Sequence, residues 1–469
     1  MMPMSLQTVL STVHGTLVPE LSEQSDFVDF EFHHIETDSR KPLENALFVA
    51  LKGERFDGHD YVNKAFDSGA AAALVSTVQE SEKPQIVVTD TLVALAELGR
   101  YQRQAHNIQT IGLTGSCGKT TTKEMMAAIL ATKGKVHATQ GNYNNEFGVP
   151  FTLFELTQDD EYSVIEMGAG KVGDIDYLTK IALPNVALIT CIAEAHLEGM
   201  GSLAGIAKTK AEIIHGLSEN GTAVLPYDLR WLDSWKPKVS DSQNLTTFGL
   251  DADADFYATD ITSSESGMQF IVHHKDESAA VQLPLPGEHN VLNGLAAIAA
   301  TTALGLTLNE AAEGLARVGN TSGRLAPIAG INGSQILDDT YNANPKAMLA
   351  AGEVLSHYSQ RKVFIAGDMA ELGSDSAEIH RQVGIELKQL PIDQVLTVGE
   401  QSAYLSEGYG EGALHFISKE SLIDYIKPEL NEDTVLVVKG SRSSAMETVV
   451  TELMESNSSQ TTTEESTAC

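Results

Sequence analysis

The sequence predicts an α/β protein of three domains: a small mixed α/β domain, a central domain with a mainly parallel sheet and a second α/β domain. Its 469 residues are about three times the usual domain size of roughly 150 residues. From Ile108 onward, short β-branched runs alternate with glycine or polar turns and helical stretches, which is typical of parallel α/β units. A second series of such runs follows the connecting segment 319–324 and indicates the further α/β domain.

The N-terminal domain is expected to span residues 1–89. Four apolar runs predict its strands, and they stand at 32–39, 46–51, 71–76 and 85–90. The stretch TLVALAELGRYQRQA at 91–105 predicts a helix that leads into the next domain.

The central domain is expected to span residues 90–318 and the C-terminal domain residues 319–455. The clearest central strands are predicted at 108–113, 162–167 and 185–190. The C-terminal strands are predicted at 334–339, 362–367, 394–399 and 434–440. Residues 456–469 are rich in Ser, Thr and Glu without apolar periodicity, so we expect a disordered tail.

Charge and composition narrow the class of partner. Lys and Arg total 31 against 64 for Asp and Glu, and a net charge of -33 disfavours nucleic acid and anionic membranes. No apolar run approaches about 18 residues, so no membrane insertion is expected. Cys117, Cys191 and Cys469 are too few and too scattered for a disulfide framework or a zinc cluster. We therefore expect a cytoplasmic protein that binds anionic substrates through a discrete loop.

Residues 114–121, TGSCGKTT, stand between a predicted strand and a helix pattern at 120–132. Gly115 and Gly118 let backbone N–H groups face a phosphate, Lys119 can reach the β and γ phosphates, and the Thr120 hydroxyl can bind magnesium. The chain has Leu113 where the strict Walker A spacing requires glycine. An ordinary glycine turn is the alternative, but Gly-Lys-Thr-Thr in this context favours nucleotide binding.

Two further residues are predicted at the carboxyl edge of the central sheet, where nucleotides bind. Glu166 ends the strand at 162–167, and His196 follows the strand at 185–190. Oxygen ligands suit Mg²⁺, which favours Glu166 as a ligand. A loop histidine is more often structural, so the residues alone leave the role of His196 open.

The stretch 203–217 predicts a helix with one apolar stripe. Lys210 lies on that stripe and Lys208 does not, so Lys208 is expected to be a solvated surface lysine. Lys210 either snorkels along the stripe or is a desolvated lysine with a lowered pKa. The sequence alone leaves both possibilities open.

Motifs along nearly the whole chain resemble those of the Mur ligases. They are GSCGKTT from 115, GNYNNEFGVP from 141, EMGAGKVGDI from 166, AHLEG from 195, HNVLNGLAAIA from 289, SGRL from 322, DDTYNANP from 338, GDMAELG from 367 and KGSRS from 439. The last three of these motifs, DDTYNANP, GDMAELG and KGSRS, are typical of members that use D-alanyl-D-alanine. The DNPR-type and KGHE motifs of the members that add the third amino acid are missing.

The resemblance implies an ATP-dependent ligase that activates a carboxylate as an acyl phosphate and then joins it to an amine. It implies an N-terminal domain that holds a UDP-sugar peptide, a central P-loop ATPase domain, and a C-terminal Rossmann-like domain that closes over ATP and binds a dipeptide. The implied substrates are UDP-N-acetylmuramoyl-tripeptide and D-alanyl-D-alanine, and the product is a UDP-muramoyl-pentapeptide precursor of peptidoglycan. A monomer is expected.

The matched motifs also imply site residues. The phosphates of ATP would be held by Gly115, Ser116, Cys117, Gly118, Lys119, Thr120 and Thr121. Two magnesium ions are implied: Thr120 and Glu166 would bind one, and His196 with a carbamylated Lys210 would bind the other. Lys119, His196 and Lys210 would be the catalytic residues.

Further roles follow from the same resemblance. Asn290 and Asn293 match the region that contacts adenine, and Arg324 and Asp339 match residues that reach the phosphate and ribose of ATP. The uridine-nucleotide site would include Ser39 and Arg40, and the muramoyl peptide would contact Asn144 and Asn145. The KGSRS segment from Lys439 either positions the dipeptide or forms a plain strand-to-helix turn.

Three other functions remain possible from the sequence. A folylpolyglutamate synthetase would accept glutamate and would favour DGAHNP in place of DDTYNANP. A P-loop phosphotransferase would leave a stable phosphorylated product and form no amide. A nonenzymatic nucleotide-regulated binding module would bind nucleotide without substrate-dependent phosphate release. The sequence does not decide whether the third residue of the accepted peptide is diaminopimelate or lysine.

Overall fold

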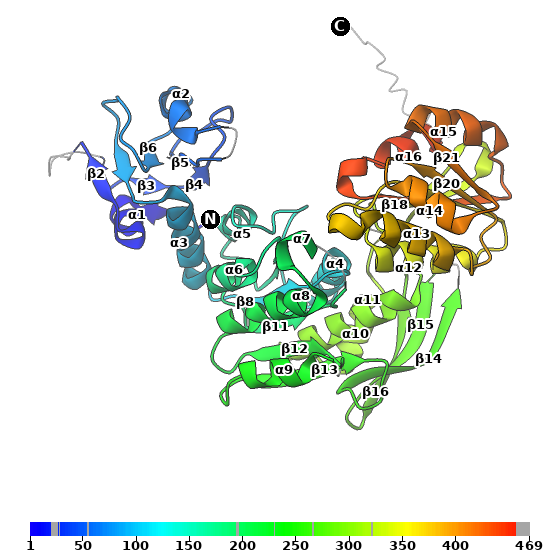
Figure 1. The fold of residues 1–469 in the computed structure, drawn as a ribbon. Coiled ribbons are helices and arrows are strands. Elements are labelled where there is room, and N and C mark those ends of the chain that lie inside the picture. Colours follow the sequence, from blue (N-terminus) through cyan, green and yellow to red (C-terminus); the bar gives the residue numbers. More distant parts are fainter. Residues whose placement is uncertain are drawn as a thin grey trace, which may run out of the picture.

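The computed structural model describes residues 1–455 except 20–26, 28, 54–55, 194–196, 229, 265–266 and 320–321. The predicted tail and His196 lie outside the described residues. Three large sheets follow one another along the chain, each with its own helices (Figure 1). The α/β prediction is confirmed.

The first sheet has five strands in the order β2-β7-β6-β5-β4, parallel except for β2. The strands are β2 (Thr16–Val18), β4 (His34–Glu36), β5 (Ala46–Val49), β6 (Ala72–Val75) and β7 (Gln85–Val87). The remaining elements are β1 (Met4–Ser5), which pairs with β3 (Glu31–Phe32), and the helices α1 (Leu6–Val13) and α2 (Val62–Asp67). All four predicted strands of this part are present.

Helix α3 (Thr91–Ala105) matches the predicted helix and joins the first two parts of the chain. Asp90 caps the start of this helix, and its carboxylate accepts hydrogen bonds from the N–H groups of Leu92 and Val93. Leu95 and Leu98 are buried in the N-terminal core, whereas Ala96 packs into a core of the central part. The helix therefore fixes the N-terminal sheet on the central one (Figure 1).

The central sheet has nine strands in the order β16-β15-β14-β13-β12-β11-β8-β10-β9. It is parallel from β9 to β14 and antiparallel from there to β16. The strands are β8 (Gln109–Thr114), β9 (Val136–Ala138), β10 (Tyr162–Glu166), β11 (Val186–Ile189), β12 (Thr222–Pro226), β13 (Asn244–Gly249), β14 (Phe256–Ser264), β15 (Gly267–His274) and β16 (Glu277–Leu283). Three of them, β8, β10 and β11, confirm the predicted strands.

Helices cover both faces of this sheet, which explains why its strands read as continuous apolar runs. Successive residues of β10 point to opposite cores: Val164 packs on one face and Ile165 on the other. The first face carries α4 (Lys119–Leu130), α10 (Glu288–Thr302) and α11 (Leu308–Leu315). The second face carries α5 (Gly148–Phe154), α6 (Asp174–Ala182), α8 (Leu203–Lys210) and α9 (Leu232–Trp235), and α7 (Leu197–Met200) precedes α8.

The helix predicted over 203–217 is shorter than expected. Helix α8 ends at Lys210, and a 3₁₀ turn continues over Ala211–Gly216. The hydroxyl of Thr179 donates to the carbonyl of Ile213 (2.9 Å), the group that an α-helix would offer to the N–H of residue 217. The accepting carbonyl lies within the 3₁₀ turn, whose backbone is more tightly wound than that of an α-helix.

The C-terminal sheet has six strands in the order β17-β18-β22-β19-β20-β21, parallel except for β17. The strands are β17 (Ala326–Ala329), β18 (Gln335–Asp339), β19 (Arg361–Ala366), β20 (Gln394–Val398), β21 (Ala413–Phe416) and β22 (Thr434–Lys439). One face is covered by α12 (Pro345–Ser356), α13 (Ser376–Leu387) and α14 (Ser402–Tyr409), and the other by α15 (Lys419–Ile426) and α16 (Glu447–Leu453). The Rossmann-like prediction and its four strands are confirmed. Among the helices of the described residues, none has the length and apolar content to cross a bilayer.

Candidate active site

A cavity of about 1690 Å³ opens at the carboxyl ends of the parallel strands, between the central and C-terminal parts. Its central wall consists of the loops that follow β8, β10 and β11 and of the start of α10. Its C-terminal wall consists of the loops that follow β18 and β22. This is the edge at which α/β sheets bind ligands.

The loop between β8 and α4 has the backbone shape of a phosphate site. Gly118 precedes α4 with φ +77°, and a Cβ atom there would lie 2.3 Å from the Asn293 side-chain oxygen. At Gly115 a Cβ atom would lie 1.9 Å from the Thr190 hydroxyl oxygen. No side chain caps the N-terminus of α4, so its N–H groups remain available to an anion.

Lys119 stands at the start of α4 and lines the cavity. Its Nζ donates to the carbonyl of Gly115 (2.8 Å), which folds the side chain back over the loop. Burial lowers the pKa of Lys119, and the Arg324 guanidinium lowers it further, while Glu166 acts in the opposite direction. A polyanion bound at this loop would relieve the repulsion between the two cations.

Thr120, Glu166 and Asn144 form one hydrogen-bonded group. The Thr120 hydroxyl donates to one carboxylate oxygen of Glu166 (3.0 Å), and the Asn144 amide donates to the other (2.8 Å). Both oxygen donors predicted for magnesium are thus adjacent, and hard oxygen ligands suit Mg²⁺. The described residues contain no group of three or more His, Cys, Asp or Glu that could hold a metal ion.

Arg324 reaches this group from the C-terminal part of the chain. One terminal nitrogen donates to the Thr120 hydroxyl (3.2 Å), and the guanidinium stacks 4.0 Å from the centroid of the Tyr341 ring. Its Nε is buried and makes no hydrogen bond with any residue that the structure describes. A buried donor without a partner is costly, so this nitrogen indicates where an anionic ligand would bind.

Asp339 is buried and paired rather than free. Lys439 stands opposite it in the parallel pair of β18 and β22, and its Nζ lies 2.6 Å from a carboxylate oxygen of Asp339 and 2.9 Å from the carbonyl of Asn342. Burial raises the pKa of Asp339 and lowers that of Lys439, and each charge opposes the shift of the other. The Lys439 ammonium is therefore committed to Asp339. Within KGSRS, Arg442 lines the cavity with a side chain that is 70% exposed.

Asn290 and Asn293 support the phosphate loop. The Asn290 amide donates to the carbonyl of Pro286 (2.7 Å), and its oxygen accepts a hydrogen bond from the Asn293 amide (3.0 Å). This fixes the Asn293 oxygen against Gly118. Both residues line the cavity, and their contact with adenine remains a prediction.

Lys210 ends α8 and is only 2% exposed. It makes no hydrogen bond or ion pair with another residue of the described chain. Burial lowers its pKa to about 7, with a further contribution from Lys119, whereas Asp174 and Glu212 oppose the shift. Lys208 is exposed, as predicted. Of the two possibilities for Lys210, the structure favours the desolvated lysine.

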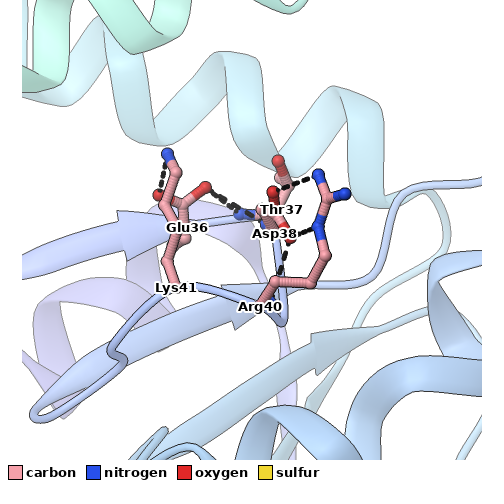
Figure 2. A network of polar contacts seen from close by, with 5 residues as sticks. All are labelled: Glu36, Thr37, Asp38, Arg40 and Lys41. Atoms are coloured by element: carbon pink, nitrogen blue, oxygen red, sulfur yellow. Dashed lines mark hydrogen bonds and ion pairs between the residues drawn. The ribbon is translucent and has the colours of Figure 1, made fainter.

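The residues predicted for the uridine site lie outside the lining of this cavity. Ser39 is buried, and Arg40 forms a bidentate pair with Asp38 at 2.7 and 2.8 Å (Figure 2). Next to them, Lys41 pairs with Glu36 at 2.6 Å. The pKa of Lys41 is raised, mainly by its hydrogen bond with Glu36.

Tyr143, in the central loop 141–147, also contributes to the raised pKa of Lys41. Asn145 in that loop accepts hydrogen bonds from the N–H groups of Phe147 and Gly148, so its oxygen supports the start of α5. Asn144 and Asn145 both line the cavity, whereas the Arg40 loop does not.

The sequence analysis missed two features of the site. One is the Lys439–Asp339 ion pair. Both residues stand at the same distance from the starts of the strands predicted at 334–339 and 434–440, and this could have indicated the pair. The other is a disulfide between Cys117 and Cys191, residues that the sequence analysis regarded as scattered. Both cysteines follow adjacent parallel strands, a signal that is visible only once the strand order is known.

Comparison with known proteins identifies relatives over almost the whole chain. Domain profiles match at 31–103 (Mur ligase family, catalytic domain), 113–301 (Mur ligase middle domain) and 323–442 (Mur ligase, glutamate ligase domain). The UDP-N-acetylmuramoyl-tripeptide–D-alanyl-D-alanine ligase of Escherichia coli K12 is 44% identical over 451 residues, which cover 95% of this chain and 99% of the relative.

Solved structures of Mur ligases resemble this chain over most of its length. A crystal structure of MurF from Acinetobacter baumannii has a TM-score of 0.90 at 36% identity and covers 97% of this chain and 99% of that one. MurF ligase from Thermotoga maritima in complex with ADP has a TM-score of 0.81 at 30% identity and covers 89% of this chain and 96% of that one.

Replacement of Lys439 by methionine tests the buried ion pair. The variant leaves the Asp339 carboxyl buried without its cation, and removal of one partner of such a pair costs about 3–5 kcal/mol. We expect the free energy of unfolding in urea to fall by roughly this amount. Lys208→Met, at an exposed site, is the control and should stay within about 0.5 kcal/mol of the wild type. Equal effects in both variants would contradict the pairing.

The buried amine of Lys210 predicts a pH-dependent stability. Its folded-state pKa of about 7 is below the ordinary value of 10.5, so the unfolded chain binds more protons between these values and stability rises with pH across that window. We therefore compare the free energy of unfolding of Lys210→Met with that of the wild type in buffers free of CO₂. The difference between variant and wild type should favour the variant more at pH 6 than at pH 10, by at least about 1 kcal/mol. Lys208→Met should show no such difference. A pH-independent effect of Lys210→Met would argue against a desolvated ammonium.

Proposed function

The chain belongs to the Mur ligase family, and from this membership we propose that it joins D-alanyl-D-alanine to UDP-N-acetylmuramoyl-tripeptide in an ATP-dependent reaction. The names of the relatives support this choice of substrates. The observation that carries the proposal is the convergence of Lys119, Glu166 and Arg324 on one cavity between two domains. An in-line phosphoryl transfer needs this concentration of charge around the terminal phosphate.

The first step would activate the tripeptide. A carboxylate oxygen attacks the γ-phosphorus of ATP, an O–P bond forms, the β–γ bridging bond breaks, and ADP leaves. Lys119 and Arg324 stabilise the charge that spreads over the phosphoryl oxygens. Thr120 and Glu166 would hold magnesium, which when bound neutralises further charge on the phosphates.

The second step would form the amide. The neutral amine of D-alanyl-D-alanine adds to the acyl carbon, the tetrahedral intermediate expels phosphate, and the nitrogen loses a proton. An acyl phosphate hydrolyses readily, so the cavity must exclude water during its lifetime. Closure of the C-terminal domain over the phosphate loop, through Arg324 and Tyr341, would serve this purpose.

We propose that Lys210 carries a carbamate. Carbon dioxide adds only to a neutral amine, and the lowered pKa of this buried lysine keeps part of it neutral near pH 7. The resulting anion would hold a second magnesium ion together with His196. Among the residues that the structure describes, the Lys210 amine has no hydrogen-bond or ion-pair partner, which supports this role.

The remaining roles are proposed on the same basis. The N-terminal domain, residues 1–89, would hold the UDP-sugar peptide through Ser39 and Arg40, with contacts from Asn144 and Asn145. Asn290 and Asn293 would bind adenine, and Asp339 the ribose. A reaction that consumes ATP fits a cytoplasmic location, and we propose that the chain acts as a monomer.

Phosphate release tests the substrates. With ATP, magnesium, UDP-N-acetylmuramoyl-tripeptide and D-alanyl-D-alanine all present, we expect release of phosphate and a pentapeptide product by mass spectrometry. Omission of any one component should abolish the product. Glutamate in place of the dipeptide distinguishes a folylpolyglutamate-type ligase, and a stable phosphorylated product without an amide would indicate a phosphotransferase. Release that ignores the dipeptide would overturn the proposal.

Lys119→Ala tests the phosphate loop. Loss of this ammonium removes charge stabilisation from the phosphoryl transfer, and we expect kcat to fall by at least about 10³-fold, the scale of losing a key electrostatic contact. The exposed Lys208→Ala should keep wild-type activity. An unchanged rate of ligation in Lys119→Ala would refute the assigned role.

A further inference from the structure

The phosphate loop is covalently tied to the neighbouring strand. Cys117, inside the loop, forms a disulfide with Cys191, the second residue after β11, across 74 residues of chain and a Cα–Cα distance of 6.0 Å. Both residues line the cavity, and both are partly exposed. A small reagent in the cavity can therefore reach the sulfur atoms.

The disulfide engages one hydrogen-bond donor that a phosphate would use, and a backbone hydrogen bond engages a second. The N–H of Ser116 donates to the carbonyl of Cys191 (3.0 Å), and the N–H of Cys117 faces the Cys191 sulfur (3.2 Å). On the other side, the Thr190 hydroxyl donates to the carbonyl of Cys117 (2.6 Å). Consequently, the middle of the loop is bound to the end of β11 rather than open to an anion.

We propose that Cys117 and Cys191 are a thiol modification site at which low-molecular-weight disulfides control nucleotide binding. In the oxidised chain, the loop is fixed on β11 with its N–H groups engaged. In the reduced chain, the Cys191 sulfur is free to rotate away, so the Cys117 N–H can turn toward a phosphate. Nucleotide affinity therefore follows the oxidation state of the pair.

The exchange is balanced in atoms and electrons. A protein thiolate attacks one sulfur of a small disulfide RSSR, an S–S bond forms, the R–S–S–R bond breaks, and one RSH leaves after protonation. The second protein thiolate then attacks the protein sulfur of the mixed disulfide and expels the second RSH. The protein pair loses two electrons, which the small disulfide gains. A small dithiol reverses both steps.

The test compares ADP binding by the full chain in its two oxidation states. The protein is treated with oxidised glutathione or with dithiothreitol, the cysteine pairing is mapped by peptide mass spectrometry, and the dissociation constant of ADP is measured by calorimetry. We expect the oxidised chain to bind ADP at least about tenfold more weakly, which corresponds to about 1.4 kcal/mol. Addition of dithiothreitol to the oxidised sample should restore the affinity.

Two variants assign the effect to the pair. Cys191→Ala removes the partner of Cys117 and cannot form the internal disulfide. When peptide mass spectrometry shows that no glutathione remains on Cys117, the ADP affinity of this variant should not respond to the treatment. Cys469→Ser keeps the pair and should respond as the wild type does. Because the readout is ADP binding, it does not depend on which carboxylate or amine the enzyme joins.

Equal ADP affinity of the oxidised and reduced wild type would overturn the proposal, as would a response in Cys191→Ala molecules that carry no glutathione on Cys117. Mapping that places Cys469 in the disulfide would also overturn it. If Cys191→Ala binds ADP weakly even when reduced, the comparison of the two wild-type forms still decides the matter.

Discussion

The site depends on one polar link between two domains: Arg324 donates to Thr120, and Thr120 donates to Glu166. Thr120 belongs to the helix that begins at the phosphate loop, and Glu166 ends the adjacent strand, so the link reports the position of both. If the C-terminal domain moved away, Arg324 would lose this contact and its stacking on Tyr341 would no longer face the phosphates. The positive charge at the phosphate site therefore depends on the position of the C-terminal domain, which carries Arg324.

The supporting residues act in the same direction. Asn290 holds Asn293, and Asn293 lies so close to Gly118 that no side chain fits there. On the opposite side, Thr190 fills the space next to Gly115. The shape of the loop is thus enforced from two elements, α10 and the end of β11, before any ligand arrives. At the start of α4, where no side chain of the described residues caps the N–H groups, such preorganisation lowers the cost of binding, because this part of the loop does not have to be ordered by the phosphate.

Strand periodicity and the phosphate-loop motif predicted the fold and the central half of the site. Lys119, Thr120 and Glu166 were assignable because parallel strands place their carboxyl ends on one edge. Pairings between distant segments were not assignable: Lys439 with Asp339 requires that β22 insert beside β18, and Cys117 with Cys191 requires that β11 insert beside β8. The end of the α-helix at Lys210 was not assignable either, because the apolar stripe continues through the 3₁₀ turn over Ala211–Gly216.

The cations of the site explain why an acidic protein attracts a polyanion. The chain carries a net charge of -33, yet Lys119 and Arg324 line the cavity together, and Lys119 contributes to the lowered pKa of the buried Lys210. Their mutual repulsion and their burial lower the pKa values of the two lysines, so the site is destabilised until an anion binds. A nucleotide relieves this repulsion in the cavity that Arg324 helps to close. Nucleotide binding is then most favourable when the two domains are together, so that occupancy of the phosphate loop is coupled to domain closure.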